Sequence, residues 1–147
     1  MGIAAQVRNY RVRAGRSRKE VAEHLGINEA WYDDLEKYDE ELTSTLTLFQ
    51  AVALASFLGV RLRELIAETN APRVTLSILD LPPRIRTHIE RKGMTVEQLE
   101  GELGWEISEF LESPMKVAAE SPIVFLEAIS ELLGINWLSM VPDDDAD

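Results

Sequence analysis

Apolar residues recur at helical spacing along most of the chain, and polar capping residues divide them into short segments. Val7, Tyr10 and Ala14 share one face of a helix that this spacing predicts near the N-terminus. Residues 17–20 read Ser-Arg-Lys-Glu, a Ser-x-x-Glu capping box, so a second helix is predicted to begin there. Gly26 can end this second helix, because glycine readily adopts the left-handed conformation that closes a helix.

A third helix is predicted to begin at Asn28, which can cap it. Ile27, Trp31 and Leu35 recur every four residues, so we expect all three to face the core. This spacing gives the helix a single apolar stripe.

After an acidic loop, the pattern becomes almost entirely apolar. Either Thr45 or Thr47 opens this helix, which runs to Gly59. A last short helix holds Leu62 and Leu65. The first part of the chain is therefore predicted to contain five helices.

The same order of residues recurs in the second part of the chain. Gly, Ser or Thr, an aliphatic residue, Leu and Gly of residues 13–27 return in residues 91–105 at a constant offset of 78. Residues 56–62 match residues 131–137 at an offset of 75. Two matches in the same order predict a duplicated unit, whose second copy is three residues shorter in its middle.

The pattern therefore predicts an all-α protein of two tandem five-helix units that pack against each other. Residues 1–68 form the first unit and residues 81–141 form the second. Residues 69–80 are expected to link them, and the Asp-rich residues 142–147 to form an acidic tail. Within the linker, residues 74–78 alternate apolar and polar positions as a short strand does.

Each unit is too small to bury a large core by itself. A chain of about 60 residues buries only about 60% of the surface that it exposes when unfolded, so we expect an apolar seam between the units. Trp105 and Trp137 are bulky for such small units, and a buried indole N–H needs a partner. At least one of them is therefore predicted to lie at the seam. Val96, Ile107 and Phe110 belong to the second core or, alternatively, to a partner or dimer surface.

Charge changes the picture that the helices give. The 147 residues carry a net charge of −11 at pH 7, which counts against nucleic-acid binding because clustered Lys and Arg supply most of that affinity. The distribution is uneven, since residues 1–25 hold six Lys or Arg against two Asp or Glu. Residues 26–58 hold one Lys against seven acidic residues. A basic N-terminal segment therefore precedes an acidic one.

The composition also argues against several chemical classes. The chain contains no Cys, which excludes disulfides, thiolate metal sites and cysteine nucleophiles and fits a reducing compartment. No apolar run reaches the roughly 18 residues of a membrane-spanning helix, and the N-terminus lacks the apolar region of a signal peptide, so a cytoplasmic protein is expected. His24 and His88 stand singly, without the spacing of a metal site. Without a Gly-rich phosphate loop or a nucleophile motif, we expect no enzyme activity, no metal and no cofactor.

Five short motifs follow one another in the first unit: Ser17-Arg-Lys-Glu20, Val21-Ala22, Leu25-Gly26-Ile27, Leu35-Glu36 and Leu58-Gly59-Val60. Their order resembles the lambda-repressor-like, Xre/Cro-type helix-turn-helix family. The resemblance covers Ile3 to Ile66 and, more faintly, Leu81 to Val141. It implies that the second and third helices form the helix-turn-helix and that the third enters the major groove of DNA.

The resemblance also implies which residues touch DNA. They are Arg16, Arg18, Lys19, Asn28, Glu29, Ala30, Asp33 and Lys37. The first three would grip phosphates at and ahead of the second helix, and the others belong to the third. Acidic residues on this third helix depart from the family pattern, and each should cost about 1 kcal/mol or more near phosphates.

The family pattern gives Glu36 and the second unit different roles. An acid at the position of Glu36 commonly pairs with an arginine of the first helix, here Arg8 or Arg11. Where the first unit has its basic residues, the second has Val96 and Glu97. We therefore expect the second unit not to bind phosphate.

Two functions from different classes follow. The first is a sequence-specific DNA-binding transcriptional regulator, a homodimer whose first unit contacts double-stranded DNA while the second serves dimerisation or regulation. The second is a protein-interaction module, such as an antitoxin or immunity-like partner, that keeps the fold but docks a basic protein on its acidic face. The family resemblance favours the first function, and the net charge favours the second.

Overall fold

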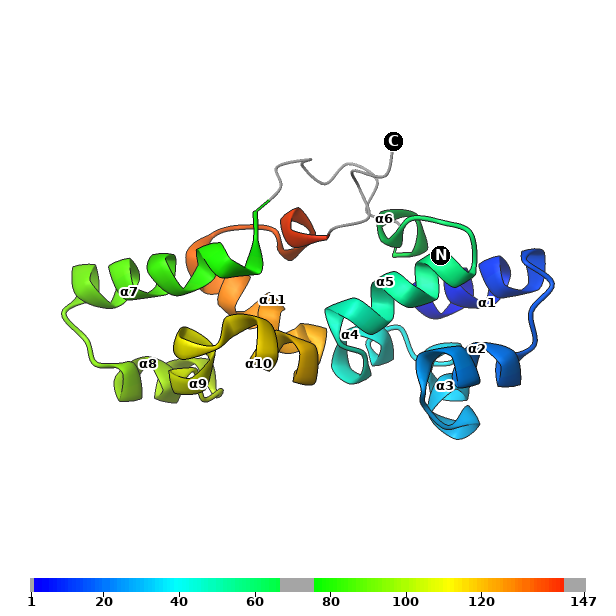
Figure 1. Ribbon diagram of the computed structural model, residues 1–147, viewed down its shortest axis with the longest axis horizontal. Helices are drawn as coiled ribbons and strands as arrows, with labels where there is room; N and C mark the ends of the chain where they lie inside the picture. The colour runs from blue at the N-terminus through cyan, green and yellow to red at the C-terminus, as the bar shows by residue number, and fades with distance from the viewer. Residues whose placement is uncertain (1, 67–75, 142–147) are drawn as a thin grey trace.

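The computed structural model describes residues 2–66 and 76–141, and every regular element within these ranges is helical (Figure 1). The expected all-α class is therefore confirmed. The N-terminal half, residues 2–66, holds α1 (Ile3–Arg13), α2 (Arg18–Leu25), α3 (Glu29–Leu35), α4 (Glu41–Thr45), α5 (Leu48–Phe57) and α6 (Leu62–Leu65). The C-terminal half, residues 76–141, holds α7 (Leu81–Lys92), α8 (Val96–Leu103), α9 (Ser108–Glu112), α10 (Pro114–Glu120) and α11 (Ile123–Leu133), with the 3-10 helices η1 (Ile78–Asp80) and η2 (Trp137–Met140).

The predicted helix starts of the N-terminal half agree with the structure. At α2, the Ser17 Oγ accepts a hydrogen bond from the Glu20 backbone N–H at 3.1 Å, and the Glu20 Oε1 accepts one from the Ser17 N–H at 3.0 Å. Thr47 and Gln50 form the same reciprocal pair, so α5 begins after Thr47 and not at Thr45. Both pairs satisfy N–H groups that a helix N-terminus otherwise leaves without partners.

The segment that was expected to be an acidic loop contains a helix, α4. The described residues of the N-terminal half therefore hold six helices and not five. Leu42 is fully buried and anchors α4 to the core. The Thr45 hydroxyl donates a hydrogen bond to the Glu41 carboxylate at 2.7 Å, which ties the two ends of this helix together. A single apolar anchor thus orders a segment whose acidic composition suggested a loop.

The prediction that Trp31 faces the core is wrong. The Trp31 side chain is 55% exposed, whereas Tyr32 and Leu35 are fully buried. The reason is that Tyr32 and Glu36 lie one turn apart and both point inward, and Trp31 precedes this stripe by about 100° around the helix axis. The helix is also shorter than expected, because α3 ends at Leu35 and does not reach Lys37.

The helices of the two halves follow the offsets read from the sequence. Moving α2 by 78 residues gives Val96–Leu103, the bounds of α8. Moving α6 by 75 residues gives Trp137–Met140, the bounds of η2. Elements of the two halves thus correspond at these offsets, although the described residues of the C-terminal half hold five α-helices and two 3-10 helices and not five helices in all.

The expected linker is shorter in the structure than residues 69–80. Ser77 and Asp80 form a capping box around η1, and this 3-10 helix leads directly into α7. The described part of the predicted strand at 74–78 is therefore not a strand, because Ser77 caps η1 and Ile78 is buried as its first residue. Residues 67–75 and the acidic tail at 142–147 lie outside the described residues.

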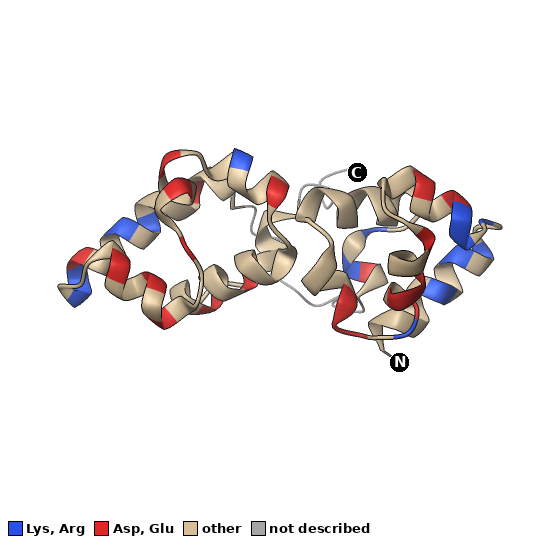
Figure 2. Ribbon diagram, turned by 90° about the horizontal axis from the view of Figure 1, so that it is seen from below, with Lys and Arg blue, Asp and Glu red and all other residues tan. Residues whose placement is uncertain are grey.

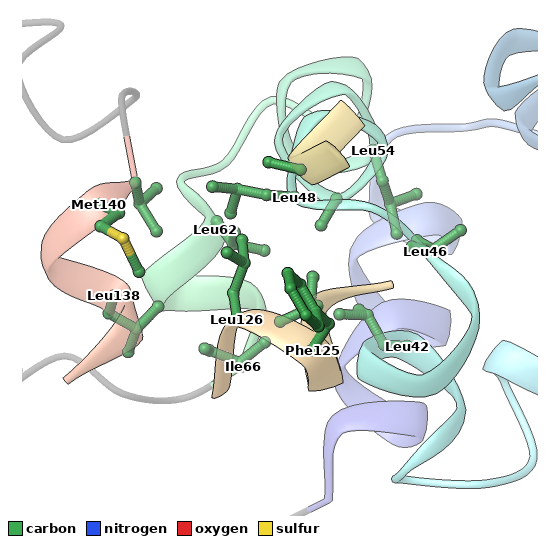
Figure 3. Close-up of a cluster of buried hydrophobic side chains, with 14 of the residues drawn as sticks. Leu42, Leu46, Leu48, Leu54, Leu62, Ile66, Phe125, Leu126, Leu138 and Met140 are labelled. Carbon is green, nitrogen blue, oxygen red and sulfur yellow. The ribbon is translucent and has the colours of Figure 1, made fainter. Parts of the chain in front are cut away.

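The two halves share one hydrophobic core. Figure 1 shows α1–α3 and α7–α9 at opposite ends of an elongated molecule, with α4, α5 and α11 between them. Figure 3 shows the cluster where they meet, formed by Leu42, Leu46, Leu48, Leu54, Leu62, Ile66, Phe125, Leu126, Leu138 and Met140. We call this cluster the seam, and its presence agrees with the seam expected from the small size of each half.

Backbone hydrogen bonds also cross the seam. The Ile123 N–H, at the start of α11, donates to the Leu46 carbonyl at 2.9 Å. The Arg63 guanidinium donates to the Leu138 carbonyl at 3.3 Å, and both residues are buried. These bonds satisfy polar groups that burial at the seam would otherwise leave without water.

The aromatic residue within the seam is Phe125 and not a tryptophan. Trp105 is half-buried and packs edge-on against the Phe125 ring, with ring centroids 5.3 Å apart, so it supports the seam from within the C-terminal half. Trp137 opens η2, the element whose Leu138 carbonyl accepts the bond from Arg63. Trp105 and Trp137, the tryptophans predicted for the seam, thus lie next to it, and the aromatic ring at its centre is that of Phe125.

We expect Phe125→Ala to lower the free energy of unfolding by about 3–5 kcal/mol, because the change leaves a large cavity where the two halves meet. Urea unfolding followed by circular dichroism measures this loss. As a control, Val12→Ala changes a side chain that is 60% exposed and should alter stability by less than about 0.5 kcal/mol. Equal effects of the two substitutions would contradict a shared core.

Candidate nucleic-acid interface

The α2 and α3 helices are joined by a three-residue turn. Gly26 closes α2 in the left-handed conformation, with φ at 71°. Asn28 then caps α3, because its Oδ1 accepts a hydrogen bond from the Trp31 N–H at 2.8 Å. The two short helices contact each other across this turn.

The first residues of α3 are open to solvent. Asn28, Glu29 and Ala30 are all exposed, so the N-terminus of the helix can approach a partner. Asp33 is only half-exposed, and its Oδ1 atom is buried without a hydrogen-bond partner in the described part of the chain. The outer face of α3 is therefore less acidic than the sequence suggested, and Glu29 is its most accessible carboxylate.

A buried ion cluster fixes α3 to α1 and α2. The Glu36 carboxylate is 2% exposed and accepts hydrogen bonds from Arg11 at 2.6 and 3.1 Å and from the Arg18 Nε at 3.3 Å. Of the two arginines expected to pair with Glu36, the structure selects Arg11 and leaves Arg8 exposed. We call Glu36, Arg11 and Arg18 the Glu36 cluster.

The Glu36 cluster keeps all of its members charged. Burial raises the pKa of the Glu36 carboxyl, but the hydrogen bonds from Arg11 and the charges of Arg11 and Arg18 outweigh it, so the pKa lies below its ordinary value of 4.5. The hydrogen bond to Glu36 raises the pKa of Arg11. Burial likewise raises the pKa of the neighbouring Tyr32 hydroxyl, which stays protonated.

The three cations predicted to bind phosphate differ in their contacts with other side chains. Arg18 is shared with Glu36, although its side chain remains 45% exposed. Arg16 lies over the Phe57 ring at 4.3 Å and 3.9 Å from the Glu20 carboxylate. Lys19 is exposed and makes no ion pair with any residue that the structure describes. We call Arg16, Arg18 and Lys19 the α2 cations.

The structure adds basic residues that the sequence reasoning did not include. Arg8 and Arg13 on α1 line an open groove of about 890 Å³ together with Lys37 from the end of α3. Both arginines fall outside the apolar stripe of α1, and from this position the sequence could have predicted that they are exposed. Figure 2 shows the Lys and Arg of the N-terminal half gathered at its outer end, with acidic residues beside them. The predicted Lys37 is thus close to two further cations.

Neither histidine forms a metal site. The His24 ring stacks on the Phe57 ring, with centroids 4.0 Å apart, so it packs against the same ring as Arg16. Among the described residues, no group of three His, Cys, Asp or Glu side chains could hold a metal ion. The helices that the structure describes are likewise all too short or too polar to cross a bilayer.

The corresponding surface of the C-terminal half is organised by acidic residues. The Glu100 carboxylate accepts hydrogen bonds from the Ile107 and Ser108 N–H groups at 2.6 and 3.3 Å, which closes the turn between α8 and α9. These bonds lower the pKa of Glu100. At the positions of Arg18 and Lys19 stand Val96 and Glu97, so the α8–α9 pair offers no cations at its N-terminus.

Comparison with protein-family models, curated proteins and solved structures finds no match to this chain. The site is therefore interpreted from its own geometry and from the family resemblance of its motifs.

We expect Glu36→Gln to lower the free energy of unfolding by about 3 kcal/mol at neutral pH, because it leaves the buried Arg11 uncompensated. The folded pKa of Glu36 is lowered, so its stabilisation is complete above about pH 4.5 and is lost as the pH falls through the folded pKa. The difference in the free energy of unfolding between wild type and Glu36→Gln should therefore become smaller as the pH falls, as urea unfolding at several pH values would show. As a control, Glu23→Gln changes an exposed residue of α2, and its free energy of unfolding should match that of wild type at every pH.

Proposed function

We propose that this chain is a DNA-binding regulator that contacts double-stranded DNA through α2 and α3. The observation that carries the proposal is the Glu36 cluster, which ties the C-terminal end of α3 to Arg18 at the start of α2, while Asn28, Glu29 and Ala30 at the other end of α3 are exposed. Phosphates would lie against Lys19, Arg16 and the free part of Arg18, and base edges against Asn28, Glu29 and Ala30. Glu29 can accept a hydrogen bond from the amino group of cytosine.

In this proposal the C-terminal half supports dimerisation or regulation and does not read DNA. Its packing against α4 and α6 leaves the outer end of the N-terminal half free for a ligand. A homodimer would bring two such ends to neighbouring half-sites, as two-fold symmetric regulators do.

DNA affinity should depend steeply on salt. If each chain neutralises about three phosphates, the slope of log K against log salt is expected near −2.7 per chain and near −5 for a homodimer. Fluorescence anisotropy with a pool of random-sequence duplexes at low salt measures this slope. A flat response would contradict phosphate binding.

Lys19→Gln should reduce that slope by about 0.9, because it removes one phosphate contact. Lys116→Gln is the matched control, since Lys116 is a similarly exposed lysine of the C-terminal half that pairs with Glu109 at 3.1 Å. The control should leave the slope unchanged. An equal change in both variants would place the binding surface elsewhere.

The exposure of Trp31 favours a second candidate, a protein-interaction module. Trp31 is 55% exposed on a helix that also carries Glu29, Asp33 and Asp34. Exposed tryptophans concentrate binding energy at protein interfaces, and surrounding carboxylates would attract a basic partner. In this candidate the same helix face docks a basic protein, as in an antitoxin or immunity-like complex.

The double change Asp33→Asn and Asp34→Asn separates the two candidates. It should strengthen DNA binding by up to about thirtyfold, because it removes about 1 kcal/mol of repulsion per carboxylate near phosphates. If the face instead docks a basic protein, the change should slow association with a lysine-rich peptide probe. Anisotropy with labelled duplex and stopped-flow mixing with labelled peptide give opposite signs for the two functions.

A further inference from the structure

A groove between α7 and the end of α11 gathers basic side chains of the C-terminal half. It has a volume of about 390 Å³ and is lined by Arg84, His88 and Arg91 on α7 and by Leu132 and Leu133 on α11. None of the residues that line it is acidic. Arg84 and Arg91 are exposed, and the two leucines are half-buried against the core. The groove therefore has basic side chains on one side and apolar side chains on the other.

The three basic residues share one face of α7. They lie at positions i, i+4 and i+7, which a helix brings into line along its axis. The rise of the helix separates their backbones by about 6 and 4.5 Å. The buried residues Leu81 and Ile85 lie beside this face, so its edge is the line along which α7 packs on the core.

These basic side chains have no partners within the described part of the protein. Arg84, His88 and Arg91 make no ion pair or hydrogen bond there, in a chain with 26 acidic against 15 basic residues. Arg86 on the same helix does have a partner, the Glu112 carboxylate at 3.4 Å. The Thr87 hydroxyl donates to a backbone carbonyl at 3.0 Å, so the donors that remain for a ligand are those of the three basic side chains.

The set is not shared with the N-terminal half. At the offset of 78, the three positions are occupied by Gln6, Tyr10 and Arg13, of which one is basic. The basic face of α7 therefore belongs to the C-terminal half alone. The acidic residues of α8 and α9 make the C-terminal half acidic as a whole, so its net charge does not reveal the basic residues of α7.

We propose that this groove binds a small organic anion, a carboxylate or phosphate carried on an apolar body. Guanidinium groups grip such acids through paired N–H donors, which gives orientation as well as affinity. The acid group would lie among Arg84, His88 and Arg91, and the apolar body would cover Leu132 and Leu133. A volume of about 390 Å³ lies within the range of small-molecule sites. The proposal does not depend on DNA binding, which is placed in the other half.

The test uses 8-anilino-1-naphthalenesulfonate, an aromatic anion whose fluorescence rises when it leaves water. We expect it to bind the native protein. The double variant Arg84→Gln, Arg91→Gln should bind it about tenfold more weakly or worse, because it loses the charge-assisted hydrogen bonds of both guanidinium groups. Arg86→Gln is the matched control on the same helix and should change affinity less than about twofold. Competition by naphthoate and by naphthyl phosphate then separates carboxylate from phosphate ligands.

Three results would overturn the proposal. One is unchanged binding of the fluorophore by the double variant. Another is an equal loss in Arg86→Gln. The third is binding of the uncharged N-phenyl-1-naphthylamine with the same affinity and the same site dependence, which would show an apolar pocket indifferent to charge. Circular dichroism of the double variant keeps the test valid, since Arg84 and Arg91 are exposed and their replacement should leave the helical signal intact.

Discussion

The structure depends on the seam, the part of the hydrophobic core that the two halves share, because units of about 65 residues are only marginally stable by themselves. Leu42 and Leu46 of α4 meet Phe125 and Leu126 of α11, and the Leu46 carbonyl accepts a hydrogen bond from the first N–H of α11. The middle of the molecule is thereby devoted to stability. The two ends, with α1–α3 on one side and α7–α9 on the other, carry the surfaces available to ligands.

Within the N-terminal half, the Glu36 cluster determines what α3 can present. A carboxylate that is 2% exposed has to be compensated, and the two arginines that compensate it come from α1 and α2. The position of α3 is therefore fixed from two directions. The same requirement draws Arg18 partly away from the surface, so one residue serves both the fold and the proposed phosphate contact.

The sequence predicted those features that depend on local chemistry. Capping boxes at Ser17 and Thr47 located helix starts, because their partners stand three residues away. The family resemblance offered two arginines, Arg8 and Arg11, as the partner of Glu36, and one of them is correct. Features set by tertiary packing were missed: Trp31 has helical spacing with its neighbours, but the inward stripe passes through Tyr32.

The groove on α7 was missed for a related reason. Arg84 and Arg91 lie in a helix whose charges balance in part, and no pattern along the chain shows that α11 closes the other side of the groove with Leu132. Such a site requires two elements far apart in sequence, and one-dimensional periodicity reports on a single element at a time.

The two halves differ at the positions of the Glu36 cluster. At the offset of 78, Arg11, Arg18 and Glu36 correspond to Ile89, Val96 and Pro114, so apolar residues stand at all three positions. Replacing a complete buried ion group by apolar side chains is often neutral, whereas removing one member leaves an isolated charge at a cost of several kcal/mol. The single substitutions are therefore strongly epistatic. Conversion between the ionic set and the apolar set, one residue at a time, therefore passes through destabilised intermediates in either direction.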